Sequence, residues 1–437
     1  MSKSTPLATR ILWGLVIGIV AAVVTLGIGQ VHPPMLAFMR RISSAVFDPF
    51  GQVFLRILFF VVIPLVFTSL ASGVTQLGRL DKLGPLAGRT FVMFFLNMVI
   101  GVAIGLVMMN TLRPGHHLNP QAAAQLLEEY GSGAQAIPAH TAQTELSLST
   151  LVEMFMPRNL VGAVSGQSRA TLGDVLPLIV FAILFGGAAT QLGERRRKAL
   201  LEGLDTISEV MTDIVHFALR LAPYAVPAMI YSVIVKVGLD VLLALSVFVI
   251  GCALALALHL FGTMSLWLRF LAKRSPLPFF RLIRPVLVTA FSTSSSNATL
   301  PTALASASED LKLAPSTANF VLPLGSTMNM SGTALYEGCV VLFVAQVFGV
   351  DLSLSQQIML MLLAVLSAVA VAGIPGGSLP LIAGLLVTFG VPAEGIGIII
   401  GIDRVLDMMR TTTNVGSDVV TAVVVDYQLQ RGQAVTR

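Results

Sequence analysis

The stretch GIDRVLDMMRTTTNVGSDVVTAVVV, from Gly401 to Val425, carries a polar face inside an otherwise apolar sequence. Six polar residues lie along it at offsets of 0, 4, 7, 8, 11 and 15: Asp403, Asp407, Arg410, Thr411, Asn414 and Asp418. At about 100° per residue they fall within roughly 100° of one side of an α-helix. Charged side chains at membrane depth normally face a protein interior or a substrate pathway, because exposing them to lipid is costly. Since both signs of charge occur, the pattern suits a site for a small zwitterion or anion together with cations.

The composition of the whole chain indicates a membrane protein. Of the 437 residues, 55% are hydrophobic and 11% are charged, whereas a soluble domain carries about 25% charged residues. A bilayer core needs about 20 residues per helix, and nine apolar stretches are predicted to form helical spans or pairs of half-spans. They are Arg10–Gly29, Val53–Val74, Phe91–Leu112, Val175–Gly187, Ile207–Val237, Leu242–Leu271, Ala314–Val350, Ile358–Val391 and Gly395–Val425. We therefore expect an all-α polytopic membrane protein.

The basic residues lie where membrane topology would put them, so the net charge of +5 does not indicate a nucleic-acid partner. The positive-inside rule places the N-terminus, the Arg195–Lys198 loop and the C-terminus in the cytoplasm, with the chain in the plasma (inner) membrane. The first span lacks a small-residue cleavage site and is predicted to be retained. The polar insertion from about Pro114 to Ser149 is predicted to be a mobile external loop with surface histidines.

Two interrupted stretches predict re-entrant helical hairpins. Leu277–Leu311 has the polar centre FSTSSSNATLP, Phe291 to Pro301, between apolar arms. Leu360–Leu386 repeats this design around AGIPGGSLP, Ala372 to Pro380. Irregular backbone at membrane depth is tolerated only where it is buried in protein or lines a cavity. Each tip is therefore expected to stop inside the protein.

Each hairpin is expected to be followed by a broken polar helix, at Gly325–Thr333 and at Arg410–Asp418. The distance from tip to asparagine is similar in both units, 33 residues to Asn329 and 37 residues to Asn414. Two such units in series indicate an internal repeat. If the first hairpin enters from the cytoplasm, the helix between them brings the second in from outside. The result is an inverted repeat with its site near the midplane.

The polar residues of these units have the chemistry of a cation site. Unwound backbone offers carbonyl oxygens, and Asn329, Asn414 and Asp418 add side-chain oxygens near them. Such a hard oxygen cage suits a monovalent cation such as Na⁺, whereas the soft ligands that zinc or copper prefer are missing.

An anion site is predicted beside it. Free N–H groups at hairpin tips suit a carboxylate, and the serines from Ser294 to Ser296 add hydroxyl donors. Arg410 can hold a second carboxylate bidentately, and Asp407 can hold an ammonium. In the alternative interpretation, these polar groups bind no substrate and only bond to one another, for example as an ion pair of Asp407 with Arg410.

Two further carboxyl groups have two interpretations each. Asp403 either joins the site or stabilises its helix through neighbouring amides or Arg404. Glu337 lies in an apolar stretch and is either a proton site or a structural hydrogen-bonding group.

With these motifs, the chain resembles the dicarboxylate/amino acid:cation symporter family, which includes the glutamate transporters. The signatures are Thr293–Pro301, Gly325–Thr333, Gly373–Gly377 and Gly401–Asp418, and the resemblance covers nearly the whole chain. It implies a glutamate-transporter-like elevator fold with eight transmembrane helices, two re-entrant helical hairpins and inverted repeats. It also implies a homotrimer.

The resemblance implies domain boundaries as well. Residues 1–88 would hold scaffold helices 1 and 2, and residues 89–112 helix 3 of the transport domain. Residues 113–238 would hold the external loop and scaffold helices 4 and 5. Residues 239–427 would complete the transport domain with helix 6, hairpin 1, helix 7, hairpin 2 and helix 8, before a cytoplasmic tail at 428–437. The second hairpin would be the outer gate.

The resemblance also implies site residues. The substrate site would comprise Ser294 and Ile374 through their backbone, with Ser296, Thr333, Asp407, Arg410, Thr411 and Asn414. One Na⁺ site would use the carbonyl of Gly325 with Asn329, Asn414 and Asp418. A second would use the carbonyls of Thr327, Ala368, Val369 and Val371.

Three departures from the family pattern concern ion coupling and substrate. Ser331 stands where sodium-coupled relatives carry Asp, and Asn97 and Met98 stand where they carry a Thr-Ser pair. A third sodium site is therefore expected to be absent or altered. Relatives carry an arginine at the position of Ser294 or of Met408, and here Arg404, about one turn earlier, is a candidate substitute.

The predicted function is a secondary active symporter of acidic amino acids, aspartate or glutamate, coupled to Na⁺ with H⁺ as an additional candidate. The first alternative is a C4-dicarboxylate:cation symporter, in which Asp407 would lack an ammonium partner. A neutral amino acid transporter is opposed by Arg410. An enzyme is not expected, because no His or Lys lies near a tip serine to act as its base. A passive anion channel would differ by not accumulating substrate uphill.

Overall fold

The computed structural model describes residues 7–76, 84–118, 156–165, 175–371, 373 and 376–435. These residues form helices and connecting turns, with no strand among them. By length and composition, six helices in the described part are able to cross a membrane: Thr9–Val31, Pro33–Gln76, Gly84–His117, Glu194–Val237, Asp240–Leu271 and Pro315–Val347. The predicted all-helical, polytopic class is confirmed. Most of the predicted external loop, at 119–155, and Ile374 lie outside the described residues.

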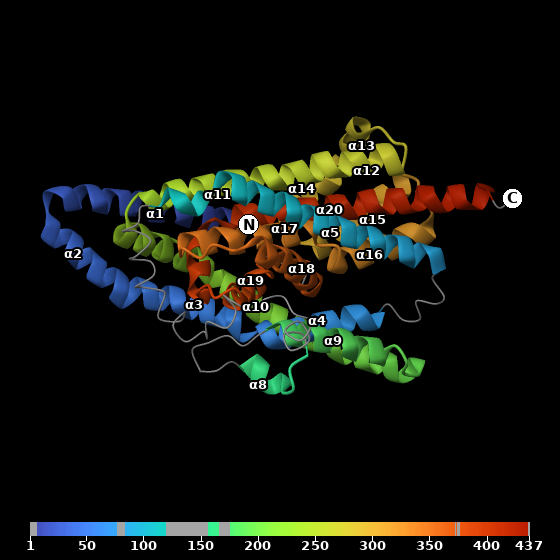
Figure 1. Ribbon diagram of the computed structural model, residues 1–437, viewed down its shortest axis with the longest axis horizontal. Coiled ribbons are helices and arrows are strands. Elements are labelled where there is room, and N and C mark those ends of the chain that lie inside the picture. The colour runs from blue at the N-terminus through green and yellow to red at the C-terminus, as the bar shows by residue number, and fades with distance from the viewer. Residues whose placement is uncertain are drawn as a thin grey trace, which may run out of the picture.

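A first group of helices comes from the N-terminal half. It comprises α1 (Leu7–Val31), α2 (Pro33–Ile42), a π-helical turn (Ser43–Phe47), α3 (Asp48–Phe60), α4 (Val62–Gln76), α8 (Leu160–Ser165), α9 (Val175–Ala189) and α10 (Glu194–Val237). The long α10 packs against α1, α3 and α4, and α4 packs against α9. Close approach of α1 depends on glycine, because a Cβ at Gly18 would lie 2.7 Å from the carbonyl oxygen of Pro227. Figure 1 shows the blue and green helices α3, α4, α9 and α10 along one side of the molecule.

A second group contains α5 and nearly all of the C-terminal half. It comprises α5 (Gly84–Leu112), a 3₁₀ turn (Pro114–His117), α11 (Asp240–Ala257), a π-helical turn (Leu258–Thr263), α12 (Met264–Leu271), α13 (Pro276–Leu282), α14 (Arg284–Thr293), α15 (Ser296–Glu309), α16 (Pro315–Met328), α17 (Ser331–Val347), α18 (Leu354–Ala370), α19 (Leu379–Thr388), a 3₁₀ turn (Ala393–Gly395) and α20 (Ile396–Val435). Helix α20 is central, since α5, α11, α14, α16 and α17 all pack against it.

The first predicted hairpin is the helix pair α14–α15. Helix α14 ends where Ser294 adopts a left-handed conformation (φ 50°, ψ 34°), which reverses the chain. Ser295 then caps α15, because its Oγ accepts a hydrogen bond from the backbone N–H of Ala298 at 3.2 Å. The pair therefore turns within two residues.

The second predicted hairpin is the pair α18–α19, and its tip touches the first. The Ser295 hydroxyl donates to the carbonyl of Gly373 at 2.8 Å. A Cβ at Gly373 would lie 3.0 Å from the carbonyl oxygen of Ser326. Glycine thus lets the second tip lie directly on the first tip and on the end of α16.

The two helices that follow the hairpins differ. Helices α16 and α17 are separated at Asn329 and Met330, where ψ is 62° and 59°, so the predicted break there is present. The predicted break at Arg410–Asp418 is wrong, because α20 runs without interruption through that segment. The segment contains no proline, and the hydroxyls of Thr412 and Thr413 bond to carbonyls four residues earlier in the same helix. Its polar side chains are therefore compatible with a continuous helix.

Three predicted boundaries also differ from the structure. Helix α5 begins at Gly84, before the expected start at residue 89. Helix α20 continues to Val435, into the expected tail. The basic segment Arg195–Lys198 lies in the first turn of α10 instead of in a loop.

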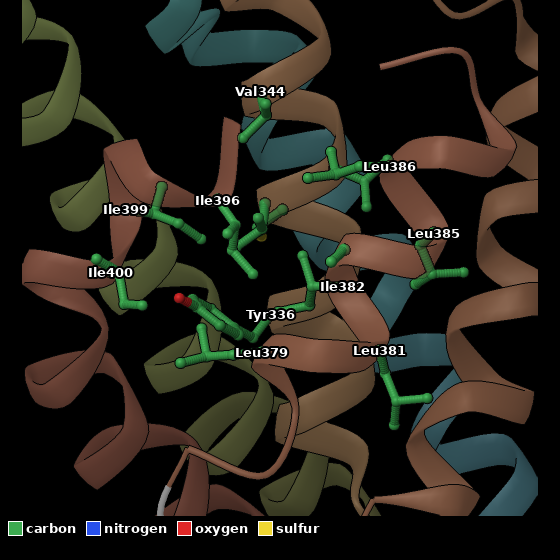
Figure 2. Packing of buried hydrophobic residues seen from close by; sticks show 14 of the residues in the cluster. Tyr336, Val344, Leu379, Leu381, Ile382, Leu385, Leu386, Ile396, Ile399 and Ile400 are labelled. Carbon is green, nitrogen blue, oxygen red and sulfur yellow. The ribbon is translucent and has the colours of Figure 1, made fainter. Parts of the chain in front are cut away.

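Helix α17 lies at the centre of the larger apolar core. All of its residues except Gln346 are buried. Figure 2 shows Tyr336 of α17 packed among Leu379, Ile382 and Ile396, which come from α19 and α20. A second apolar cluster joins α12 and α14–α16 to the C-terminal half of α20. These two cores fix the positions of the hairpin tips, the α16–α17 break and the polar face of α20.

Candidate substrate and cation site

A small cavity lies where the two hairpin tips meet the α16–α17 break and α20. Its lining residues are Ser294, Ser296, Met330, Thr333, Val371, Gly373, Ser378, Asp407, Arg410, Thr411 and Asn414. Seven of the eight residues expected in the substrate site are among them. The eighth, Ile374, lies outside the described residues.

Arg410 is held between two carboxylates at one wall of this cavity. Its Nη2 donates to Asp407 Oδ1 at 2.7 Å, and its Nη1 donates to Asp403 Oδ1 at 3.3 Å. The guanidinium also stacks on the ring of Tyr336, with Cζ 4.7 Å from the ring centroid. Only 3% of the Arg410 side chain is exposed. Since a buried guanidinium is rigid when its donors are engaged, this geometry aims a fixed positive charge at the cavity.

Both oxygens of Asp407 already have donors. Arg410 contacts Oδ1, while Oδ2 accepts from the backbone N–H of Gly376 at 3.2 Å and lies 3.4 Å from Nη1 of Arg404. The ion pair of Asp407 with Arg410, which was the alternative interpretation, is therefore present in the structure. Both residues also line the cavity. Among the described ion pairs, Asp403 contacts Arg410 and not Arg404, so it shares the arginine with Asp407.

Hydroxyl groups without partners face the same cavity. The Oγ atoms of Ser294 and Ser378 are buried and make no hydrogen bond with the described residues. A buried polar atom without a partner is costly, and a ligand would remove that cost. Sequence reasoning did not assign Ser378, Met330 or Gly373 to the site, and it assigned Val371 only to the second cation site. The signal for Ser378 was its position directly after Gly376–Gly377, where it is the second tip's counterpart of the serines in the first.

Asn414 connects α20 to the start of α17. Its Oδ1 accepts from the backbone N–H groups of Gly332 and Thr333 at 2.7 and 3.2 Å, and its Nδ2 donates to the Thr333 hydroxyl at 3.0 Å. The first N–H groups of a helix have no partner within it, so the asparagine satisfies two of them. Its side-chain oxygen is therefore engaged by the start of α17.

Asn329 and Asp418, two residues of the proposed first cation site, contact each other. Asn329 Nδ2 donates to Asp418 Oδ1 at 2.8 Å, and Asn329 Oδ1 is buried without a partner. A Cβ at Gly325 would lie 2.4 Å from Asp418 Oδ1, so glycine is required for the carboxylate to approach α16. One carboxylate, one free amide oxygen and the carbonyl end of α16 form a donor set that fits a hard monovalent cation.

The expected second cation site lies between two helix ends. Thr327 is in the last turn of α16, and Ala368 and Val369 are in the last turn of α18, which packs against α16. Val371 follows in extended conformation. The C-terminal carbonyls of a helix carry partial negative charge, so two such ends close together favour a cation.

Where a third sodium site is expected to be absent or altered, the polar groups are engaged with one another. Asn97 of α5 accepts from the Trp267 indole at 2.9 Å and donates to the Thr421 hydroxyl at 3.0 Å. Ser331 bonds to Ser417 at 3.1 Å. Neither Asn97 nor Ser331 brings a carboxylate, and both have protein partners already.

The chain is similar to known transport proteins over most of its length. The model of the sodium:dicarboxylate symporter family matches residues 7–428. A proton/sodium-glutamate symport protein of Bacillus caldotenax is 31% identical over 96% of this chain and 93% of the relative. A proton/glutamate-aspartate symporter of Escherichia coli is 29% identical over 86% of this chain and 84% of the relative. A C4-dicarboxylate transport protein of Rhodospirillum rubrum is 31% identical over 90% of this chain and 84% of the relative. The chain therefore belongs to the sodium:dicarboxylate symporter family, and it is a multi-pass membrane transporter and not an enzyme.

Proposed function

We propose that this protein is a secondary active symporter of aspartate or glutamate, driven by Na⁺ and assisted by H⁺. The observation that carries the proposal is the cavity in which Arg410 and Asp407 lie beside unpartnered serine hydroxyls. This set offers a guanidinium, a carboxylate and hydroxyl donors within one small volume. An acidic amino acid carries the complementary groups, two carboxylates and an ammonium.

In the proposed bound state, Arg410 holds the side-chain carboxylate of the substrate and Asp407 holds its ammonium. The second carboxylate lies against Ser294 and Ser296 at the first hairpin tip. The Arg410–Asp407 hydrogen bond of 2.7 Å must loosen, because both groups change partners. Each charge-assisted hydrogen bond lost between Arg410 and Asp407 is replaced by one to the substrate. Neither Arg410 nor Asp407 is therefore left unpaired.

Na⁺ is the proposed co-transported ion at Asn329 and Asp418. Helix α20 carries both Asp418 and the substrate-facing Asp407, Arg410 and Thr411. The second cation position lies at the end of α18, next to the hairpin tip that covers the cavity. A cation at either position would therefore stabilise the closed arrangement that a bound substrate also requires.

Glu337 is the proposed proton-carrying group. It is fully buried in α17, and both of its carboxyl oxygens lack a hydrogen-bond partner among the described residues. An unpaired charge in such a place is very costly, so the group is neutral when the site is closed. A proton taken up on one side and released on the other would then move with the substrate.

We also propose the elevator arrangement that the family resemblance implied. The α1–α4 and α8–α10 group would be the scaffold of a homotrimer, and the second group would carry the sites as a moving domain. Eight transmembrane helices with two re-entrant hairpins, and cytoplasmic termini in the inner membrane, complete the proposal. It is supported by the packing of α10 with α1, α3 and α4 and by the packing of α5, α11, α14, α16 and α17 around α20.

A C4-dicarboxylate is the second candidate substrate, and one observation favours it. Both oxygens of Asp407 already have protein donors, including the extra cation Arg404. A dicarboxylate without an ammonium would leave these contacts intact. The similarity to a C4-dicarboxylate transport protein points the same way.

Uptake into proteoliposomes tests these proposals. The purified protein is given aspartate, glutamate or succinate under separate Na⁺ and H⁺ gradients. We expect uphill uptake of aspartate or glutamate that requires an inward Na⁺ gradient. If the site depends on the ammonium of the substrate, succinate uptake should reach at most about a tenth of that rate. Preferred uptake of succinate would favour the second candidate. Equilibration without accumulation under any gradient would contradict symport.

A further inference from the structure

A basic segment, residues 269–284, joins α12 to α14 and takes no part in the substrate and cation site. Of its sixteen residues, five are basic and none is acidic. All five are exposed: Arg269, Lys273, Arg274, Arg281 and Arg284. Arg274 donates to the carbonyl of Leu311 at 3.5 Å. Neither Glu309 nor Asp310, which precede Leu311, pairs with any of the five among the described ion pairs. The segment therefore concentrates positive charge without a counter-charge from the described residues.

The apolar span before this segment is long enough to carry it to the lipid headgroups. Helix α11, the π-helical turn and α12 form one span of 32 residues, Asp240–Leu271. At about 1.5 Å per residue this span measures about 48 Å, whereas a bilayer with its headgroup layers measures about 40–45 Å. Figure 1 shows α13 at the edge of the molecule, next to α12 and toward the same end as the C-terminus. The length of the span therefore places the basic segment at headgroup depth.

Helix α13 has an inner aromatic side and an outer side on which leucine and arginine are both exposed. Phe279 is buried, and its ring centroid lies 5.6 Å from that of Phe280, which in turn lies 5.2 Å from that of Phe261 in the π-helical turn. Leu277 is 64% exposed, and Arg281, four residues later on the same side of the helix, is exposed as well. An exposed leucine is costly in water, and an exposed arginine is costly in hydrocarbon. At the bilayer interface, the leucine meets acyl chains while the arginine reaches the headgroups.

The end of α12 shows the same combination. Leu266 and Phe270 lie four residues apart on α12 and are 56% and 60% exposed, and Arg269 lies in the last turn of this helix. Lys273 then adopts a left-handed conformation (φ 53°) at the turn toward α13. Because α13 packs against both α12 and α14, the basic and apolar side chains of the segment lie close together.

We propose that the basic segment and the end of α12 form a binding surface for anionic phospholipids of the surrounding bilayer. The phosphate-bearing headgroups contact the basic side chains, and the acyl chains contact Leu266, Phe270 and Leu277. Clusters of about four to eight Lys and Arg residues next to a membrane span have the charge that attracts anionic lipids. A soluble phosphate would match the charge but would leave the exposed leucines and the phenylalanine in water. The bound lipid holds the outer end of α14 at Arg284, and the other end of this helix leads to Ser294 in the substrate cavity.

Tryptophan fluorescence at this surface tests the proposal. The chain has two tryptophans, and Trp267 lies on α12 two residues before Arg269, so Trp13→Phe leaves a single local reporter. The full-length Trp13→Phe protein is reconstituted in phosphatidylcholine vesicles that contain a fixed fraction of brominated phosphatidylglycerol or of brominated phosphatidylcholine. Bromine on the acyl chains quenches a nearby indole. We expect brominated phosphatidylglycerol to quench Trp267 at least about threefold more effectively than brominated phosphatidylcholine.

Two variants with the same loss of charge locate the effect. The first neutralises four residues of the basic segment and keeps Arg274, which bonds to Leu311: Arg269→Gln, Lys273→Gln, Arg281→Gln and Arg284→Gln. The control neutralises four residues in the first turn of α10, in the other helix group: Arg195→Gln, Arg196→Gln, Arg197→Gln and Lys198→Gln. We expect the preference for phosphatidylglycerol at Trp267 to fall to about one in the first variant and to stay unchanged in the control. If the first variant does not fold, Arg281→Gln with Arg284→Gln should lower the preference by about half.

Three outcomes would overturn the proposal. Equal quenching by the two brominated lipids before any charge is removed would show that the surface does not select anionic lipid. An equal loss of preference in the α10 control would show that the overall charge of the protein, and not the basic segment, attracts the lipid. Inorganic phosphate, added at constant ionic strength, should leave the quenching by phosphatidylglycerol unchanged. Relief of the quenching by phosphate would assign the surface to a soluble anion.

Discussion

The two hairpin-plus-helix units of this protein build their shares of the site in different ways. After α14–α15, the chain breaks between α16 and α17 and offers backbone groups at Asn329 and Met330. After α18–α19, the chain continues as one helix, α20, which offers charged side chains instead. A repeated arrangement can thus supply a polar site either from unwound backbone or from the side chains of an intact helix. Here it uses one of each.

The two units also complete each other. Asn414 of α20 satisfies the free N–H groups at the start of α17, and Asn329 at the α16 end donates to Asp418 of α20. The break therefore depends on the intact helix, and the carboxylate of the intact helix depends on the break. Substitutions in the two units should have different effects, because α20 contributes charged side chains and the α16–α17 break contributes backbone groups.

The largest effect is expected from Arg410→Ala. The change leaves Asp403 and Asp407 buried without their shared cation and removes the partner of the substrate carboxylate. Loss of such a pair costs about 2–5 kcal/mol, which corresponds to roughly 30- to several-thousand-fold in affinity. Aspartate binding to the purified variant, measured calorimetrically, checks this, with neutral amino acids as additional ligands. Unchanged aspartate affinity would mean that Arg410 is structural.

Asp418→Asn should have the next largest effect, on the cation and not on the substrate alone. The change keeps the size of the side chain and removes the one carboxylate beside Asn329. We expect the Na⁺ concentration required for half-maximal aspartate binding to rise by about 100-fold. A Na⁺ titration at saturating aspartate measures it. Transport that never depended on Na⁺, in wild type or variant, would exclude this cation site.

Asp407→Asn should have a smaller effect that depends on the ligand. A hydrogen bond to a charged group contributes about 1.5–3 kcal/mol, so aspartate should lose roughly 10- to 150-fold in affinity. Succinate, which has no ammonium, should change by less than about threefold. Competition between the two ligands on the variant gives the ratio. Equal losses would assign Asp407 to holding Arg410 and would favour the dicarboxylate as substrate.

Asn97→Ala should change stability and leave ion coupling as it is. Its hydrogen bonds to Trp267 and Thr421 would be lost, at a cost of about 1–3 kcal/mol in unfolding free energy. Because Asn97 and Ser331 do not supply a third cation site, we expect fewer than three Na⁺ per substrate in both wild type and variant. Paired isotope fluxes of Na⁺ and aspartate count the ions. Three coupled Na⁺ in wild type would contradict the argument from these two residues.

The sequence predicted which residues gather at the site far better than how they pair. Hydropathy and spacing are enough to place Ser294, Asp407 and Arg410 on buried polar segments, and the structure brings them around one cavity. The same spacing also suggested a break in α20, which is wrong because threonine hydroxyls bond within an intact helix. Sequence reasoning also missed Ser378, which becomes visible as a site residue only when the second tip folds over the cavity.

The sequence by itself determined the helical membrane class, the two polar tips and the polar face of α20, because these follow from local hydropathy and from helical periodicity. Only the tertiary structure decided which partner each polar atom takes. Asn329 meets Asp418 across 89 residues of sequence, and Ser295 meets Gly373 across 78. Such contacts depend on how separate helices pack in three dimensions, which no local pattern specifies. The engagement of Asn414 by α17 and the pairing of Asp403 with Arg410 are both consequences of that packing.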